Sequence, residues 1–190
     1  EDIERLGGSQ PLEEPYLRAT PFLLFRRRVP WLLTLFIAEA YTGTVLRHFE
    51  AELEHAVALA FFIPLLIGTG GNVGSQTVTM IVRAMGLGQV RFQDMFKILR
   101  KEALTGVMLA AVLAVVTFGR AMTLHVGIEM GIVVAVSVIL IVIWAALVAA
   151  VLPLTLRRLR VDPAVVSAPF ITTLVDGTGL VIYFTIARLI

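Results

Sequence analysis

The sequence predicts an all-α membrane protein with five transmembrane helices in each subunit. The chain of 190 residues is 58% hydrophobic, with a mean hydropathy of +0.89 and 16% charged residues. Soluble domains carry about 25% charged residues. Five apolar segments approach or exceed the ~20 residues that a spanning helix needs. Basic residues flank these segments, which is typical of membrane topology and argues against a soluble all-α protein or a nucleic-acid-binding protein.

The first 28 residues are expected to form a cytosolic linker followed by an interfacial segment, and residues 29–190 a five-helix transmembrane domain. Residues 1–20 are polar and show no signal peptide. Residues 21–28, PFLLFRRR, have an apolar half and a basic half. This pattern favours a position along the cytosolic surface of the membrane.

The five spans are predicted at residues 30–46, 56–82, 103–123, 130–155 and 164–189. Pro64 lies inside the second span and predicts a kink there. The other prolines near the spans lie at their ends or in their first turns, where proline is tolerated: Pro30, Pro153, Pro163 and Pro169. Residues 91–102, RFQDMFKILRKE, are expected to form an amphipathic surface helix within the connection 84–102.

The distribution of Lys and Arg predicts the orientation. Only Arg47, Arg120 and Arg188 lie on one side of the predicted topology. The other thirteen basic residues lie on the opposite side: Arg5, Arg18, Arg26, Arg27, Arg28, Arg83, Arg91, Lys97, Arg100, Lys101, Arg157, Arg158 and Arg160. The positive-inside rule places the N-terminus in the cytosol and the C-terminus outside a plasma membrane. The first outward loop carries Glu50, Glu52 and Glu54, which either attract cations to an external mouth or form a solvated loop without a role.

The second span carries a polar stripe. At 100° per residue, five residues fall within a quarter-turn and Ser75 lies at its edge: Thr69, Asn72, Gln76, Thr79 and Arg83. Gly68, Gly70, Gly71 and Gly74 reduce the bulk of this span, so that backbone carbonyls can approach a neighbouring helix or an ion. Two interpretations remain open. The small residues serve close helix packing, or the stripe lines a hydrated path.

Asp176 is the second candidate feature, because a charge at mid-membrane depth costs at least ~2.5–3.5 kcal/mol and usually faces water or a partner. Thr172, Asp176, Gly179 and Tyr183 share one face of the last span. In the alternative interpretation, Asp176 is protonated or pairs with Arg83 or a backbone amide. Glu39, the other acid inside a span, is either shielded near the interface or involved in transport.

The available ligand atoms inside the membrane are oxygens, which suit Mg²⁺, Ca²⁺ or Mn²⁺ better than softer metals. The chain has no cysteine and its three histidines lie in predicted outward loops. No metalloprotease, hydrolase or phosphate-loop motif occurs on a span, so we expect no enzyme activity. One aspartate per chain supplies a carboxylate pair when two chains meet on a twofold axis.

Four sequence stretches resemble the membrane domain of the MgtE magnesium channels. They are FFIPLLIGTGGNVGSQTVTMIVRA, RVPWL at the start of the first span, LRRLRVDPAVVSAP and LVDGTGLVIYF. The similarity covers residues 16–190 with the spans in order. It implies a homodimeric bundle with a Mg²⁺ pore at the dimer axis, lined by the second and fifth helices, so that residues 29–190 form a pore domain.

By position, Asp176 matches the acid that recognises hydrated Mg²⁺ in this family. Asn72, Ser75, Thr79 and Thr172 match pore-lining positions, and Gly71 belongs to the same glycine run. Two departures stand out, because asparagines frequent in the family are replaced by Ser75 and Ala168. Relatives of full length carry cytosolic N-terminal and CBS domains, and EDIERLGG resembles the end of the helix that connects them to the membrane.

We therefore expect a Mg²⁺ channel that conducts hydrated divalent cations down their gradient, with Mn²⁺ or Ca²⁺ as further candidate ions. The expected partners are a second copy of the chain and membrane lipid, without nucleic acid. An alternative is a transporter coupled to H⁺ or Na⁺, in which Glu39 or Asp176 cycles its proton. A third is a membrane module that assembles with a partner and moves no ion.

Overall fold

The computed structural model describes residue 12 and residues 15–55, 57–160 and 168–190, and within them the chain is helical, with no strand. The elements are α2 (Pro21–His48), α3 (Glu50–His55), η1 (Val57–Phe62), α4 (Ile63–Gly86), η2 (Phe92–Asp94), α5 (Met95–Thr123), α6 (Ile128–Arg158) and α7 (Ala168–Leu189). Five stretches are long and apolar enough to cross a membrane: Pro21–His48, Ala58–Gly86, Phe92–Thr123, Ile128–Arg158 and Ala168–Leu189. The prediction of an all-α protein with five spans is confirmed.

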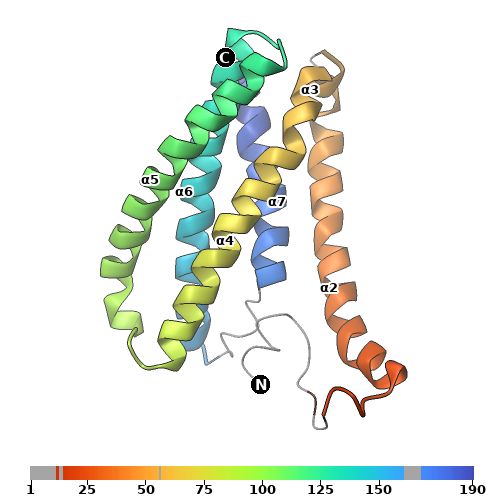
Figure 1. The fold of residues 1–190 in the computed structure, drawn as a ribbon, viewed down its shortest axis with the longest axis vertical. Coiled ribbons are helices and arrows are strands. Elements are labelled where there is room, and N and C mark those ends of the chain that lie inside the picture. Colours follow the sequence, from red (N-terminus) through yellow and green to blue (C-terminus); the bar gives the residue numbers. More distant parts are fainter. Residues whose placement is uncertain (1–11, 13–14, 56, 161–167) are drawn as a thin grey trace.

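The five long helices run roughly along the long axis of the molecule, with α6 inside and α2 at the edge (Figure 1). Half of the apolar stretch of α6 is buried within the chain, compared with 11% of that of α2. Helix α6 packs on α5, α4 and α7, whereas α2 packs mainly on α7. The core is therefore a four-helix unit built from α4 to α7, and α2 lies against one side of it.

The first span differs from its prediction at its beginning. Helix α2 starts at Pro21, where the Thr20 side chain accepts a hydrogen bond from the backbone N–H of Leu23 at 3.3 Å, and it continues through Pro30. The expected interfacial segment 21–28 is therefore part of α2, and the placement of Pro30 at a helix end is wrong. Proline removes one intrahelical hydrogen bond and kinks a helix without having to end it. The first turns of α2 lean away from the rest of its axis (red in Figure 1).

The second span also begins differently. A 3₁₀ segment, η1, leads into α4, and Pro64 lies in the first turn of α4. The predicted kink inside one continuous helix is therefore wrong. A proline in the first turn costs no hydrogen bond, because the N–H groups there have no intrahelical partner.

The predicted surface helix at 91–102 is wrong as well. Only the short turn η2 precedes α5, and α5 runs from Met95 without interruption into the third span. No proline separates the charged from the apolar part of this stretch, so a single helix accommodates both. The connection after α4 is accordingly short.

The last two spans agree with their predictions within a few residues at the ends that are described. Helix α6 begins after Gly127, whose φ of 93° is easily adopted only by glycine, and Pro153 lies inside its last turns. Residues 161–167 lie outside the described part of the chain, so the predicted start of the fifth span at 164 and the placement of Pro163 are not tested. The proposed linker at residues 1–20 also lies largely outside it.

The described ends of α4 and α6 and the beginnings of α2 and α5 lie at one end of the bundle (Figure 1). This end carries Arg157 and Arg158 of α6 and is called the basic end below. Both arginines contact the segment between α4 and α5 or the end of α4. Arg157 donates a hydrogen bond to the backbone carbonyl of Met85 at 3.1 Å, and the Arg158 guanidinium lies 4.3 Å from the centre of the Phe92 ring. The short connection between α4 and α5 is thereby held against α6.

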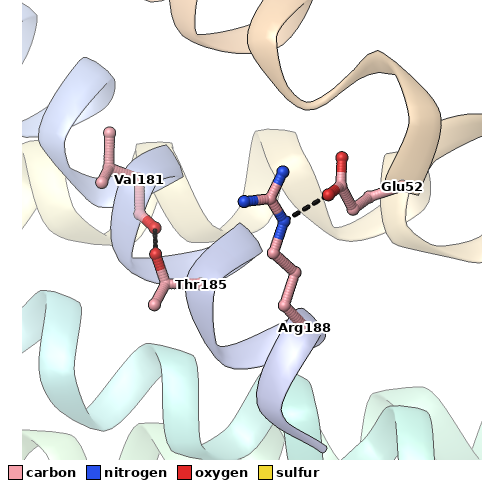
Figure 2. Close-up of polar contacts among 4 residues, drawn as sticks. All are labelled: Glu52, Val181, Thr185 and Arg188. Carbon is pink, nitrogen blue, oxygen red and sulfur yellow. Dashed lines mark hydrogen bonds and ion pairs between the residues drawn. The ribbon is translucent and has the colours of Figure 1, made fainter.

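At the opposite end, an ion pair joins the segment after α2 to the end of α7. The Arg188 side chain donates to the Glu52 carboxylate (Figure 2) and lies 4.6 Å from the centre of the Phe49 ring. Phe49 stacks on Phe184 of α7 at 4.9 Å between ring centres. The Glu52 carboxylate is therefore paired within the chain. Of the three acids in the predicted outward loop, only Glu50 is an exposed side chain in the part of the chain that the structure describes.

Candidate functional site

The candidate site lies where α4 and α7 cross, and glycines bring the two helices into close contact. A Cβ atom on Gly71 would lie 2.8 Å from Cγ2 of Thr172 on α7, and one on Gly74 would lie 2.6 Å from Cγ2 of Ile171. Both distances are shorter than real carbon–carbon contacts of ~3.5–4.0 Å. The packing interpretation of the glycines is therefore confirmed at these positions, while Gly68 has nothing within 4 Å.

Two hydroxyl groups meet across this crossing. The Oγ atoms of Ser75 and Thr172 are 3.1 Å apart, and Thr172 Oγ1 lies 3.1 Å from the backbone carbonyl of Ala168. Ser75 Oγ also lies 3.5 Å from the same carbonyl, so one hydroxyl donates to Ala168 and the other donates across to its partner. The pair ties the middle of α4 to the first turn of α7 and engages both hydroxyl protons within the chain.

Asp176 lies one turn further along α7, beside the same glycine. Its side chain is half-buried, and its Oδ1 atom lies 3.5 Å from where a Cβ atom on Gly71 would be. Within the described residues, this oxygen is shielded from solvent and has no hydrogen-bond partner. A structural pairing of Asp176 with Arg83 or with a backbone amide of these residues is therefore absent.

The polar residues of α4 that do not contact α7 lie on an exposed face. Asn72, Gln76 and Thr79 are exposed, and Arg83 continues the same stripe toward the basic end. Thr79 Oγ1 donates to the backbone carbonyl of Ser75 at 2.7 Å, which leaves its lone pairs available. No other described helix of the chain covers this stripe, although polar side chains inside a membrane face water or protein rather than lipid.

The four residues expected on one face of α7 have two different environments. Thr172 and Asp176 lie beside α4, but Gly179 packs 3.6 Å from Ile141 of α6 when a Cβ atom is added. Tyr183 is fully buried, and its hydroxyl donates to the backbone carbonyl of Leu59 at 3.0 Å. The candidate site therefore comprises the first half of this face, and the second half belongs to the core.

Helix α2 contributes residues to the neighbourhood of Asp176 that the sequence patterns did not single out. The ring of Tyr41 and the hydroxyl of Thr42 both lie against Gly177, where an added Cβ atom would be 2.5 Å from the Tyr41 ring and 3.2 Å from Thr42 Oγ1. The Thr42 hydroxyl is buried and has no hydrogen-bond partner among the described residues. Glu39, which is exposed on the same helix, is close enough to Asp176 to interact with it electrostatically.

Two tryptophans also contact α7 and had no predicted role. The Trp144 indole N–H on α6 donates to Thr178 Oγ1 at 2.9 Å. Trp31 on α2 lies 6.3 Å from Phe170, measured between ring centres. In the sequence, the contact of Trp144 was indicated only by the hydroxyl of Thr178, which follows Gly177 on an apolar helix.

The described residues contain no group of three or more His, Cys, Asp or Glu side chains that could hold a metal ion. Among the described residues the candidate site therefore offers oxygen ligands that are spread over two helices: the Asp176 carboxylate on α7, and the Asn72 amide and Thr79 hydroxyl on the exposed face of α4. Such a set suits a hard cation that keeps its water shell better than one that is stripped of water.

The comparison with known families decides the classification. The MgtE family, described as divalent cation transporters, matches residues 63–186, which include α4 to α7 and every candidate site residue. The chain belongs to the MgtE family. The family description is that of a transporter rather than an enzyme, and with the five apolar helices it makes this chain a multi-pass membrane protein.

Three curated relatives are each named magnesium transporter MgtE. The protein of Thermus thermophilus is 42% identical over all 190 residues, and that of Bacillus subtilis is 34% identical over 187 residues, or 98% of this chain. The protein of Enterococcus faecalis is 31% identical over 169 residues, or 89% of this chain. The chain spans 42%, 41% and 37% of the lengths of these relatives.

Proposed function

We propose that the chain forms the homodimeric pore domain of a Mg²⁺ channel, with residues 29–190 as the pore domain and α4 and α7 of both subunits around the twofold axis. Membership of a divalent cation transporter family and the names of the relatives support Mg²⁺ as the transported ion. The exposed Asn72, Gln76 and Thr79 of α4 support the dimer, because a second copy facing these side chains would enclose them away from lipid. Arg83 lies one turn beyond them, at the basic end, and is not part of this contact.

The observation that carries the proposal is the unpartnered Oδ1 atom of Asp176. A shielded carboxylate oxygen without a hydrogen-bond donor is stabilised by a cation or by the waters around one. Mg²⁺ gives up its waters reluctantly and is usually held through them. Two Asp176 carboxylates, one from each subunit, would therefore attract a hydrated Mg²⁺ at mid-membrane depth.

The other site residues take different roles in this arrangement. Asn72 and Thr79 present oxygen atoms on the exposed face of α4 and would contact the waters of the ion. Ser75 and Thr172 hold each other, so they position α4 against α7. Gly71 lets α7 approach α4 closely at Thr172, beside Asp176. Contacts through water are weak enough to permit release as well as binding, as conduction requires.

Mg²⁺ flux into liposomes tests the assignment. The Asp176→Asn variant keeps the shape of the side chain and removes its charge, and we expect it to lose flux about tenfold or more, which corresponds to ~1.4 kcal/mol. Asp94→Asn is the matched control, because Asp94 is an acid outside the long helices whose salt bridge to Lys97 is at the surface. Unchanged Mg²⁺ flux through a folded Asp176→Asn variant would refute the role of this residue.

The coupled transporter remains the second candidate, because Glu39 of α2 and Asp176 of α7 interact electrostatically and the titrations of interacting carboxylates are coupled. A channel carries Mg²⁺ in response to a potassium diffusion potential at equal pH on both sides. A proton-coupled transporter instead needs a pH gradient and loses its flux in the Glu39→Gln variant. A Na⁺-coupled transporter needs a sodium gradient.

We also propose that the basic end of the bundle faces the cytosol, which places the end of α7 outside the plasma membrane. The chain has no cysteine, so single introduced cysteines report their side directly. A cysteine at exposed Gln93 should react with a membrane-impermeant reagent only from the cytosolic side, and one at exposed Ile190 only from outside.

A further inference from the structure

A cavity of about 460 Å³ opens between α4 and α5 at the basic end. A short connection joins the two helices (Figure 1). Each packs closely on α6, whereas the backbones of α4 and α5 approach each other much less. The cavity thus lies between two consecutive long helices, beside the connection that joins them.

The polar part of the cavity wall carries two cations without a partner. Arg83 of α4 and Lys101 of α5 both line the cavity, and neither forms a salt bridge or side-chain hydrogen bond within the described chain. By contrast, Arg157 and Arg158 at the same end are held by Met85 and Phe92. The lining cations are therefore available to an external anion.

Apart from Gln89 and Glu102, the remaining wall is apolar. Ile81 and Ile98 form its buried part, and they belong to a small core cluster shared by α4, α5 and α6. Met80 and Leu87 also line the cavity and are exposed by 69% and 63%. A guest that complements this wall needs a negatively charged group and an attached apolar chain.

We propose that this cavity binds one anionic phospholipid, with its phosphate between Arg83 and Lys101 and an acyl chain along Met80 and Leu87. Basic pockets between spans at the cytosolic surface are suited to anionic headgroups. Glu102, the one acid in the wall, accepts a hydrogen bond from Thr77 at 3.5 Å, and the lining retains a net positive charge.

The lipid is favoured over a free phosphate or a second copy of the chain. A free phosphate would leave the exposed apolar wall uncovered, whereas a phospholipid covers both parts. A second copy would bring an identical pair of cations, which repel each other across a twofold interface. The proposal does not depend on which ion the protein transports.

Native mass spectrometry of the purified protein, titrated with phosphatidylglycerol, tests the site. We expect the Arg83→Gln/Lys101→Gln variant to bind about 30-fold more weakly, because each basic contact with an anionic headgroup contributes about fivefold in affinity. The matched control is Lys97→Gln/Arg100→Gln, which removes the same charge from exposed positions of α5 outside the cavity. It should change binding by less than about threefold, because neither side chain lines the cavity and exposed charges are partly screened by salt.

Three further results separate the possible occupants. Phosphatidylcholine should bind far more weakly, and inorganic phosphate at equal concentration should not displace phosphatidylglycerol. A phosphatidylglycerol with a photoreactive acyl chain should label peptides of α4 and α5 in the unmodified chain, so the test survives if the double variant does not fold. Any one of four results would overturn the proposal. They are equal binding by the double variant and its control, displacement by inorganic phosphate, labelling only of α2 or α7, and a disulfide between two Leu87→Cys chains.

Discussion

Replacing Gly70 with alanine tests how α4 is held in the bundle. A Cβ atom at this position would lie 2.7 Å from Cγ2 of Ile141 on α6 and 2.8 Å from Cγ1 of Val175 on α7. Both distances are about 1 Å shorter than normal contacts, and both neighbours are fully buried. Because α4 would have to move away from two helices, we expect an overpacking cost of about 1–3 kcal/mol.

Gly68→Ala is the matched control, since nothing lies within 4 Å of a Cβ atom there. Alanine favours a helix by up to ~1 kcal/mol over glycine, and this gain applies to both variants. The difference between the two variants is therefore the packing cost alone, about 1–3 kcal/mol, which changes the unfolding equilibrium constant roughly 5- to 150-fold.

Equilibrium unfolding in sodium dodecyl sulfate, followed by circular dichroism, measures this difference. The Gly70→Ala protein should unfold at a lower detergent fraction than Gly68→Ala. If the two proteins unfold together, close approach of α4 to α6 and α7 does not stabilise the bundle, and the structural reason given for the glycine run is wrong.

The remaining predictions concern the end of the bundle opposite the basic end. The hydrogen bond from Arg188 lowers the pKa of Glu52 below its usual 4.5, with a smaller contribution from His48. The contribution of this pair to stability should therefore be complete at neutral pH and disappear as the pH falls below about 4.5, and Glu52→Gln should abolish that pH dependence of thermal unfolding. Tyr183→Phe leaves the Leu59 carbonyl without its hydrogen-bond donor. The variant should lose about 1–3 kcal/mol of unfolding free energy in the sodium dodecyl sulfate experiment, and its folded fraction should retain Mg²⁺ flux.

Hydrophobic periodicity was enough to predict the number of spans, because an apolar stretch of spanning length has few alternatives in a membrane. It failed at the helix ends. Residues 21–28 and 91–102 carry charges that are typical of a segment at the membrane surface. In the structure, residues 21–28 belong to α2 and residues 95–102 to α5, because a helix can extend beyond the apolar layer without losing hydrogen bonds. Pro64 was misplaced because a 3₁₀ segment cannot be distinguished from α-helix by apolar content.

The candidate site was predictable where a residue type is costly in a membrane. Asp176 stands out in the sequence for that reason, and the glycine run stands out because small residues allow close helix packing. The structure brings Gly71, Ser75, Thr172 and Asp176 together. The contribution of Thr42 was not predictable, since a threonine in an apolar helix usually bonds to its own backbone. Its position depends on how α2 packs against α7, which helical periodicity alone does not specify.

The two tryptophans of the chain both lie against α7, Trp31 near its beginning and Trp144 near its middle. Trp144 has its indole N–H bonded to Thr178, whereas the indole N–H of Trp31 is buried without a partner among the described residues. The two fluorophores therefore have different surroundings, and replacing either one with phenylalanine isolates the emission of the other. A movement of α7 relative to α6 would change the emission of one indole, and a movement relative to α2 that of the other, so the protein carries a label-free optical sensor of its own rearrangements.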